Sequence, residues 1–347
     1  MAGSVDNSSL RVAVIGVGAL GQHHARIYGE LAREGGVELT GVFDANADQA
    51  KHIAAEIGTS VHESIEAAAE AADALSVVTP TVTHFEIASQ LLKAGRHVLV
   101  EKPMTDTSAH ATALVELAHE RSLVLQVGHV ERFNPVLSYL EKAASQPRFI
   151  ETHRLSPYPK RSTDIGVVLD LMIHDLDVVL AFVKSPVVSV DAVGVPVLSR
   201  SEDIANARLR FENGCVANVT VSRVSPERMR KIRVFSGGEQ PSYISLDYQA
   251  QEGFLYRLGL DEEKESSLLK KLFAAKDSAI VSEFAGKKIV REPVPIEKEQ
   301  PLKLELKHFV ECVRRRQTPI VSGASAKVAL DLAFEITEQI RALDAKP

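Results

Sequence analysis

Cysteine is scarce in this chain: Cys215 and Cys312 are the only two among 347 residues, and neither stands at a spacing typical of a metal site or a disulfide framework. We therefore expect no bound metal and a reducing cytoplasm as the location. No hydrophobic run is long enough to span a bilayer, and the polar start, residues 1–9, lacks the features of a signal peptide. Positive charge is not in excess, because 40 Lys and Arg against 46 Asp and Glu give a net charge of −6. This balance argues against a general nucleic-acid or membrane-surface binder.

The composition is that of an ordinary globular protein, with 45% hydrophobic and 25% charged residues and enough length for two domains. Residues 11 to about 130 alternate short apolar runs with helical patterns, which is typical of βαβ units on a parallel sheet. We predict an α/β Rossmann domain, a doubly wound parallel sheet, followed by an α+β domain with an open-faced antiparallel sheet. The predicted division is a loose tail at 1–10, the Rossmann domain at 11–145, and a substrate and oligomerisation domain at 146–347, whose last helices pack back on the first domain.

A glycine-rich turn follows the first apolar run. Val12–Ile15 leads into Gly16, Gly18 and Gly21, a spacing that lets a strand turn tightly into a helix and lets a pyrophosphate approach the main chain. The N–H groups and dipole at the helix start favour the phosphate charge, although a plain strand–turn–helix has the same pattern. Asp44 ends the second apolar run, where it can accept hydrogen bonds from both ribose hydroxyls and repel the extra phosphate of NADP, so NAD is expected. The alternative for Asp44 is a helix N-cap.

The other strand ends of the first domain also carry polar side chains. Thr79-Pro80, Glu101-Lys102-Pro103 and Gly128-His129 each follow a buried run, and ligands bind at the carboxyl ends of parallel strands. Lys102 at such a place can reach a nicotinamide or a substrate hydroxyl and stabilise a developing alkoxide. The alternative is a surface lysine before a turn proline. A short edge strand is also predicted at Val61–Glu63.

The second half of the chain changes character. Strand-like runs lie between residues 149 and 248, and one helix is predicted over Ile165–Val183. This pattern is typical of an antiparallel sheet with one covered face, which leaves the other face for a homo-oligomer, a dimer or tetramer. Residues 261–283 are predicted to be a solvated surface insertion, and Leu302–Arg315 and Ala324–Leu343 to be closing helices.

Asp170 and His174 lie four residues apart in the apolar helix, so they share a face. A polar pair in such a run is either hydrogen-bonded in the core or lines a cavity. A neutral histidine beside a substrate hydroxyl is a natural general base, and Asp170 would orient it. A buried pair that fixes helix packing is the competing interpretation. Asp175 could extend the pair to a metal site, but no further histidine or cysteine stands at metal spacing.

Basic side chains gather on either side of the predicted domain boundary. Arg132 and Asn134 in the polar stretch 129–135 are candidates for binding a phosphate or sugar hydroxyls. In an acidic protein this local positive charge indicates an anionic substrate, and a hinge with solvated charges is the alternative. The positive side chains concerned are Arg132, Arg154, Lys160 and Arg161.

Together these motifs resemble the Gfo/Idh/MocA oxidoreductases, which pair a Rossmann domain with an open-faced antiparallel-sheet domain. The resemblance runs from Arg11 to the last helix and implies that Lys102 and His174 flank the substrate carbon. The family's frequent Gly-Gly before the helix is Ile165-Gly166 here, so the local substrate contacts stay open. The residues expected along the cofactor are Gly16, Gly18, Ala19, Leu20, Gly21, Asp44, Thr79, Pro80, His84, Glu101 and Lys102, and those expected at the substrate are Arg132, Asn134, Arg161, Asp170 and His174.

Within the family, residues 129–135 and 161–166 resemble the branch that acts on UDP-linked amino sugars. That resemblance implies oxidation of the 3-hydroxyl of UDP-N-acetylglucosamine to a 3-keto sugar for later transamination, in lipid A biosynthesis. A free-sugar or inositol dehydrogenase is an alternative, as is a catalytically silent NAD-binding regulator, against which the presence of both Lys102 and His174 argues. Whether Lys102 or His174 is the base stays open.

Overall fold

The computed structural model describes residues 9–144, 146–158, 165–238, 241–258, 279–284 and 287–344, and the structural statements below concern these residues. The chain divides into two compact units, unit 1 with Met1–Phe133 and Gln300–Asp331, and unit 2 with Asn134–Glu299 and Leu332–Pro347. The boundary predicted at residue 145 lies inside unit 2 of this division. None of the helices in the described ranges has the length and apolar character needed to cross a membrane.

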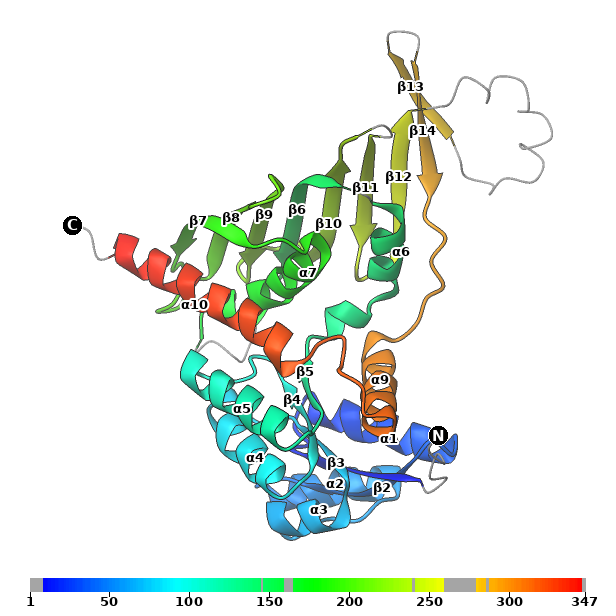
Figure 1. Cartoon of the computed structure of the whole chain (residues 1–347), viewed down its shortest axis with the longest axis vertical. Coiled ribbons are helices and arrows are strands. Elements are labelled where there is room, and N and C mark those ends of the chain that lie inside the picture. Colours follow the sequence, from blue (N-terminus) through cyan, green and yellow to red (C-terminus); the bar gives the residue numbers. More distant parts are fainter. Residues whose placement is uncertain are drawn as a thin grey trace, which may run out of the picture. The chain divides into compact units, whose positions relative to one another are not determined.

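Unit 1 contains a five-stranded parallel sheet with the strand order β2-β1-β3-β4-β5 (Figure 1). The chain leaves β1 toward β2 on one side and later returns to β3 on the other, which makes the carboxyl ends of β1 and β3 a topological switch point. This arrangement confirms the predicted doubly wound fold. The strands are β1 (Leu10–Ile15), β2 (Val37–Phe43), β3 (Ala74–Val77), β4 (His97–Glu101) and β5 (Leu125–Gly128).

Helices cover both faces of this sheet, which is why its central strands are almost continuously apolar and buried. In Figure 1, α4 and α5 lie on one side and α1 and α9 on the other. Leu306 and Phe309 of α9 are buried in one apolar cluster with Ile27 and Leu31 of α1, so a helix from late in the chain completes the core of unit 1. The helices are α1 (Gly21–Arg33), α2 (Ala47–Ile57), α3 (Ile65–Ala71), α4 (Thr81–Lys93), α5 (Ser108–Glu120) and α9 (Pro301–Arg315).

Unit 2 contains a nine-stranded sheet with the order β13-β14-β12-β11-β10-β6-β9-β8-β7. Its neighbours pair antiparallel except β6 and β9, which run parallel because the chain leaves β6 through a helix before the hairpins of β7 to β9 form. The sheet is therefore mostly antiparallel, as predicted, with one parallel pair. Its strands are β6 (Pro147–Leu155), β7 (Val187–Val195), β8 (Ile204–Phe211), β9 (Val216–Ser222), β10 (Met229–Ser236), β11 (Ser242–Asp247), β12 (Glu252–Leu258), β13 (Ala279–Phe284) and β14 (Lys287–Pro293).

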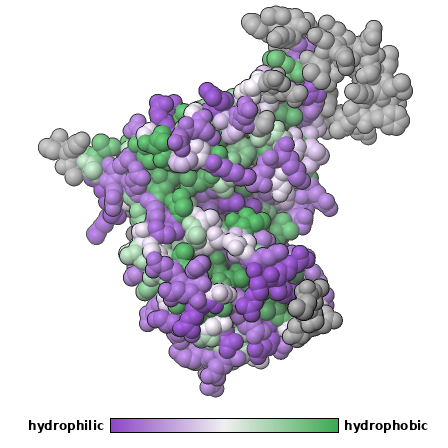
Figure 2. All heavy atoms as spheres, in the orientation of Figure 1, coloured by the Kyte–Doolittle hydropathy of each residue, from purple (hydrophilic) through white to green (hydrophobic). Residues whose placement is uncertain are grey.

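The two faces of this sheet differ in burial. On the face covered by α6 (Pro135–Ala143) and α7 (Ile173–Val183), Ile150, Ile232 and Ile244 are fully buried. The opposite face carries a ladder of aromatic rings, Phe149–Phe235–Tyr243–Tyr256, with successive ring centroids 5.7, 4.6 and 5.2 Å apart. Figure 2 shows hydrophilic residues over most of this view of unit 1, and hydrophobic residues over the part of unit 2 where Figure 1 places β7 and β8. Helix α10 (Gly323–Asp344) begins in unit 1 and ends in unit 2.

Several predicted elements were wrong in detail. Val61–Glu63 is not a strand, because Val61 makes only an isolated bridge to Val42. The helix predicted over Ile165–Val183 is divided into a π-helical turn, η2 (Val168–Met172), and α7. Of the predicted insertion 261–283, residues 261–278 lie outside the described residues, while the rest belongs to β13. Helix α6 and strands β12 and β14 were not predicted.

Candidate functional site

The glycine turn between β1 and α1 separates the glycines that the backbone needs from one that it does not. Gly16 has φ +85°, and a Cβ there would lie 2.5 Å from the Val78 carbonyl oxygen. A Cβ on Gly21 would lie 1.9 Å from the Gly16 carbonyl oxygen, whereas a Cβ on Gly18 would meet no atom within 4 Å. Packing of the chain therefore does not require glycine at 18, and the open space beside it suits a bound group. No side chain caps the start of α1 and its first turn has no acidic residue, which favours an anion.

Asp44 joins the end of β2 to the glycine turn. Its Oδ2 accepts a hydrogen bond from the Val17 N–H at 2.8 Å, and its Oδ1 accepts one from the Asn46 N–H at 2.8 Å. The alternative that Asp44 is the helix N-cap was wrong, because Asn46 holds that place and accepts hydrogen bonds from the N–H groups of Asp48 and Gln49. Asp44 thus orders the turn and keeps its carboxylate at the strand end.

His84 connects the ends of two neighbouring strands. It is 1% exposed, with Nε2 2.8 Å from the Thr79 carbonyl oxygen after β3 and Nδ1 2.9 Å from the Pro103 carbonyl oxygen after β4. The Thr83 hydroxyl donates a hydrogen bond to the Thr79 hydroxyl at 2.8 Å. Through these bonds the His84 ring holds the loops after β3 and β4 together.

Glu101 lies in a tight buried pocket at the end of β4. His24 of α1, fully buried, places Nε2 3.1 Å from Glu101 Oε1, and the Lys102 N–H donates to Glu101 Oε2 at 3.2 Å. A Cβ on Gly128 at the end of β5 would lie 2.5 Å from the same carboxylate. The Glu101 side chain therefore holds the backbone that presents Lys102. His24 was missed in the sequence, although a histidine three residues after Gly21, on the buried face of α1, was a usable signal.

Asp170 and His174 belong to the irregular start of the long helix in unit 2. Asp170 lies in the π-helical turn η2 and His174 in the first turn of α7. Both side chains are partly exposed, while Met172 and Ile173 between them are fully buried. A fully buried packing pair does not fit this exposure. π-Helical turns occur often at functional sites, which is consistent with a ligand-facing pair.

A buried polar network holds the chain just before η2. Arg223, 1% exposed, donates to Asp203 Oδ1 at 2.7 Å and to the Ile165 carbonyl oxygen at 2.7 Å. Glu202 accepts a hydrogen bond from the Val168 N–H at 3.3 Å, and a Cβ on Gly166 would lie 1.8 Å from its Oε1. The Glu202 carboxylate thus packs directly against Gly166, and a larger residue there would displace it. These positioning residues were missed because their partners lie far along the chain.

The predicted positive side chains do not form one group. Arg154 is a correction: its guanidinium is buried in an ion pair with Asp175, at 2.8 and 3.2 Å, so it lies in the core of unit 2. Asn134 is 3% exposed, caps α6 by accepting from the Val136 N–H, and donates to the Tyr248 carbonyl oxygen. Arg132 is partly exposed in the short helix η1 (Val130–Phe133) of unit 1. Lys160 and Arg161 lie outside the described residues.

The described residues contain no group of three or more His, Cys, Asp or Glu side chains arranged for a metal ion. Both cysteines are buried free thiols. Burial raises the pKa of Cys215 to about 11, so this thiol stays protonated near neutral pH.

Comparison with known proteins identifies the family of both domains. Residues 10–129 match the model of the oxidoreductase family with an NAD-binding Rossmann fold, and residues 141–239 match the Gfo/Idh/MocA C-terminal domain. The chain is 35% identical over 334 residues to UDP-N-acetylglucosamine 3-dehydrogenase of Acidithiobacillus ferrooxidans, covering 96% of this chain and 98% of that one. A solved structure of that enzyme, 35% identical, has a TM-score of 0.85 with the same coverage.

More distant relatives share the whole architecture. The chain is 26% identical to scyllo-inositol 2-dehydrogenase (NAD(+)) of Bacillus subtilis, over 96% of this chain and 94% of that one. A levoglucosan dehydrogenase structure, 17% identical, has a TM-score of 0.79 over 96% of this chain and 98% of that one, which shows the shared fold. The glycine turn, the strand-end residues, both domain matches and these full-length relatives lead to one conclusion: the chain belongs to the Gfo/Idh/MocA family and is an NAD-dependent oxidoreductase that acts on CH–OH groups.

Proposed function

We propose that this enzyme oxidises the 3-hydroxyl of UDP-N-acetylglucosamine to the 3-keto sugar, which an aminotransferase would then use. The observation that carries the proposal is the 35% identity, over nearly the full length of both chains, to UDP-N-acetylglucosamine 3-dehydrogenase of Acidithiobacillus ferrooxidans. Lys102 and His174 are both present, as turnover requires.

The cofactor would lie along the carboxyl ends of β1 to β4, and when bound it supplies the hydride acceptor. The open space at Gly18 supports a pyrophosphate there, as does the uncapped start of α1 at Gly21, which Ala19 and the N-cap residue Leu20 precede. Asp44 would bind the ribose hydroxyls, because each of its oxygens uses one acceptor position on the backbone and keeps another. Residues Thr79, Pro80, His84 and Glu101 would shape the nicotinamide end.

His174 would remove the proton from the substrate hydroxyl, and Asp170 would orient its ring. Lys102 would stabilise the alkoxide-like charge that develops as the hydride leaves the carbinol carbon. Glu101, held by His24, would keep the Lys102 backbone in place. Either Lys102 or His174 can serve as the base in this scheme, and the variant kinetics below distinguish them.

The UDP group would be bound by positive and amide side chains, namely Arg132, Arg161 and Asn134, of which arginine suits phosphate oxygens best because of its planar fork. Binding energy from the diphosphate would position the 3-hydroxyl at the reacting carbon. Asn134 is already engaged as a cap and backbone donor, so it would act chiefly by shaping the segment before α6.

A second candidate is the oxidation of inositol. Scyllo-inositol 2-dehydrogenase of Bacillus subtilis, aligned over nearly both full lengths at 26% identity, favours it, although the lower identity makes it the weaker choice.

Turnover of single variants tests the chemistry. Lys102→Ala and His174→Ala should each reduce kcat by about 10²-fold or more, the scale of a lost acid–base group, while NAD affinity and Tm change little. Lys93→Ala and His119→Ala, which alter exposed side chains of α4 and α5, are the matched controls and should retain full activity. If the pH–rate profile of His174→Ala still falls on the acid side, Lys102 is the base. Full activity in Lys102→Ala or His174→Ala would contradict the proposed roles.

We also propose that the enzyme is a cytoplasmic homo-oligomer that uses the open face of the unit 2 sheet. The aromatic ladder supports this proposal, because Phe235 is 37% exposed within it. Exposed Val193, Val195 and Ile204 extend the apolar surface over β7 and β8.

A further inference from the structure

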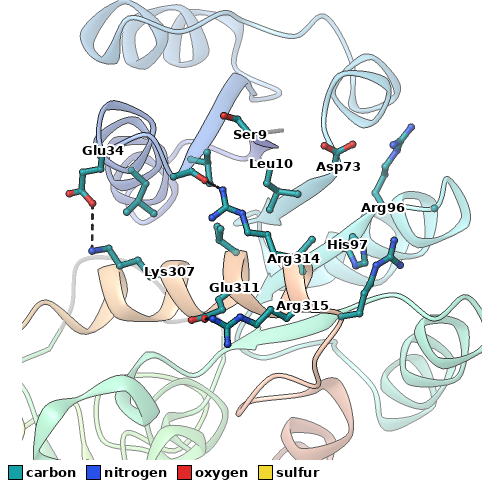
Figure 3. Close-up of a pocket in the computed structure, with 17 residues that line it drawn as sticks. Ser9, Leu10, Glu34, Asp73, Arg96, His97, Lys307, Glu311, Arg314 and Arg315 are labelled. Carbon is teal, nitrogen blue, oxygen red and sulfur yellow. Dashed lines mark hydrogen bonds and ion pairs between the residues drawn. The ribbon is translucent and has the colours of Figure 1, made fainter. Parts of the chain in front are cut away.

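A hollow of unit 1 lies at the opposite end of the parallel sheet from the glycine turn. It has a volume of about 1150 Å³, and its walls come from the starts of β1, β2 and β4, the residue before β3, and the second half of α9 (Figure 3). Because ligands of the dehydrogenase reaction belong at the carboxyl ends of these strands, a hollow at the amino ends is a separate site.

Most charged groups of this hollow are already paired. Lys307 Nζ lies 3.6 Å from Glu34 Oε2, and Arg315 Nη2 lies 2.7 Å from Glu311 Oε1. Asp73, which lines the hollow, pairs at 2.6 Å with Arg11, which does not line it. In Figure 3 the Glu34–Lys307 pair stands on one side of the hollow and Asp73, Arg96 and His97 stand on the other.

Three guanidinium groups of the lining, Arg96, Arg314 and Arg316, have no ion pair among the described residues, and Arg314 donates a hydrogen bond to the Gly36 carbonyl oxygen. The Nε atom of Arg96 is buried without a hydrogen-bond acceptor. A buried donor without an acceptor is costly, and beside a hollow it can be satisfied by an oxygen atom that enters the hollow. Asp73 is paired with Arg11 and also lies in the field of the Arg96 charge, while the Arg316 charge acts on His97.

His97 adds a neutral donor between these charges. It is 6% exposed, and its Nδ1 accepts a hydrogen bond from the Val124 N–H at 2.9 Å, so the ring proton is on Nε2. Burial, with help from the Arg316 charge, lowers the pKa of His97 to about 4. The imidazole is therefore neutral near pH 7 and can donate one hydrogen bond.

We propose that Arg96, Arg316 and His97 form a binding site for a phosphate ester of a small metabolite, separate from the dinucleotide and substrate sites. Two guanidinium forks and an imidazole N–H match the several acceptor oxygens of a phosphate. The remainder of the hollow is much larger than a phosphate and has an apolar wall of Leu10, Leu31, Val37 and Val310, which suits the organic part of an ester. This site goes beyond the proposed reaction and does not depend on it.

Calorimetric titration of the full-length protein, saturated with NAD, tests the proposal. The probes are inorganic phosphate, glucose 6-phosphate and AMP, each at the ionic strength of a chloride blank. We expect one binding event per chain that Arg96→Gln and Arg316→Gln each weaken by about 10-fold or more, the scale of a lost charge-assisted hydrogen bond. Arg315→Gln removes the same charge from a paired arginine and should change the affinity less than about 2-fold.

The outcomes separate clearly. Absence of phosphate binding by the wild type, or undiminished binding in both Arg96→Gln and Arg316→Gln, overturns the site, as does an equal loss in Arg315→Gln. Equal affinity for inorganic phosphate and both esters overturns the ester assignment. NAD affinity should be unchanged in all three variants, and since no turnover is measured, the result is independent of the substrate proposal.

Discussion

Gly18 and Gly21 offer a direct test of the cofactor site, because the same Gly→Ala change should act on different properties at the two positions. A methyl group at 18 meets no atom within 4 Å, and Gly18 is not among the glycines with positive φ. The free energy of unfolding should therefore stay constant or rise by about 0.4–1 kcal/mol, since alanine reduces the entropy of the unfolded chain.

The affinity for NAD should respond in the opposite way. If the pyrophosphate approaches the backbone at 18, the added methyl would cost one or two charge-assisted hydrogen bonds, each worth about 1.5–3 kcal/mol. The Kd for NAD should then rise by at least about 10-fold. At Gly21 the methyl would lie 1.9 Å from the Gly16 carbonyl oxygen, a backbone atom, so Gly21→Ala should destabilise the fold by about 1–3 kcal/mol or more.

Thermal unfolding of the apo-protein and calorimetric titration with NAD measure both effects on the same preparations. A Gly18→Ala variant that binds NAD like the wild type would refute the placement of the pyrophosphate. A Gly18→Ala variant that unfolds would show that the open space beside this residue is filled by the chain itself.

Two further predictions concern assembly and pH. Phe235→Glu, in the middle of the aromatic ladder, should shift the protein to a smaller species in light scattering without lowering the helix content, while Glu252→Lys at an exposed end of β12 should leave the assembly intact; an unchanged mass for Phe235→Glu would contradict the proposed interface. Burial lowers the pKa of His97 from 6.5 to about 4, so between these pH values the unfolded state binds a proton that the folded state does not bind. The free energy of unfolding should therefore keep its full value above pH 6.5 and fall by about 3 kcal/mol toward pH 4. His97→Asn should reduce this acid sensitivity in denaturant titrations, whereas the same slope in wild type and variant would assign it to other groups.

The sequence was most informative where local rules and tertiary structure agree. In unit 1, buried runs of β-branched residues and glycine turns predicted a doubly wound parallel sheet and the residues at its strand ends. The helix Ile65–Ala71 was predicted with the observed bounds. Each such element is specified by its own residues and their immediate neighbours. The errors fell where a strand depends on hydrogen bonds to a neighbouring strand. Val61 is apolar but forms only one isolated bridge, to Val42, so no strand results.

Unit 2 was harder because distant partners determine it. The pairing of β6 with β9 joins residues 67 apart, such as Phe149 and Val216. The break at η2 follows a buried network in which Glu202 and Arg223 hold the backbone at 165–168. From the sequence, Arg154 counts toward the local positive charge that indicates an anionic substrate, whereas in the fold it pairs with Asp175 of α7, 21 residues along the chain. His24 was overlooked for the same reason, since only the fold brings it to Glu101.

The central claim is that this NAD-dependent enzyme acts on a UDP-linked sugar. The most direct measurement is NADH formation by the purified enzyme with UDP-N-acetylglucosamine, N-acetylglucosamine and myo-inositol in parallel, with a 3-keto trap present because the oxidation is unfavourable near neutral pH. The account predicts kcat/KM at least about 10²-fold higher for the UDP-sugar than for the other two, because the diphosphate supplies remote binding energy. Comparable turnover of the free sugar or of inositol, with no gain from the UDP group, would contradict it.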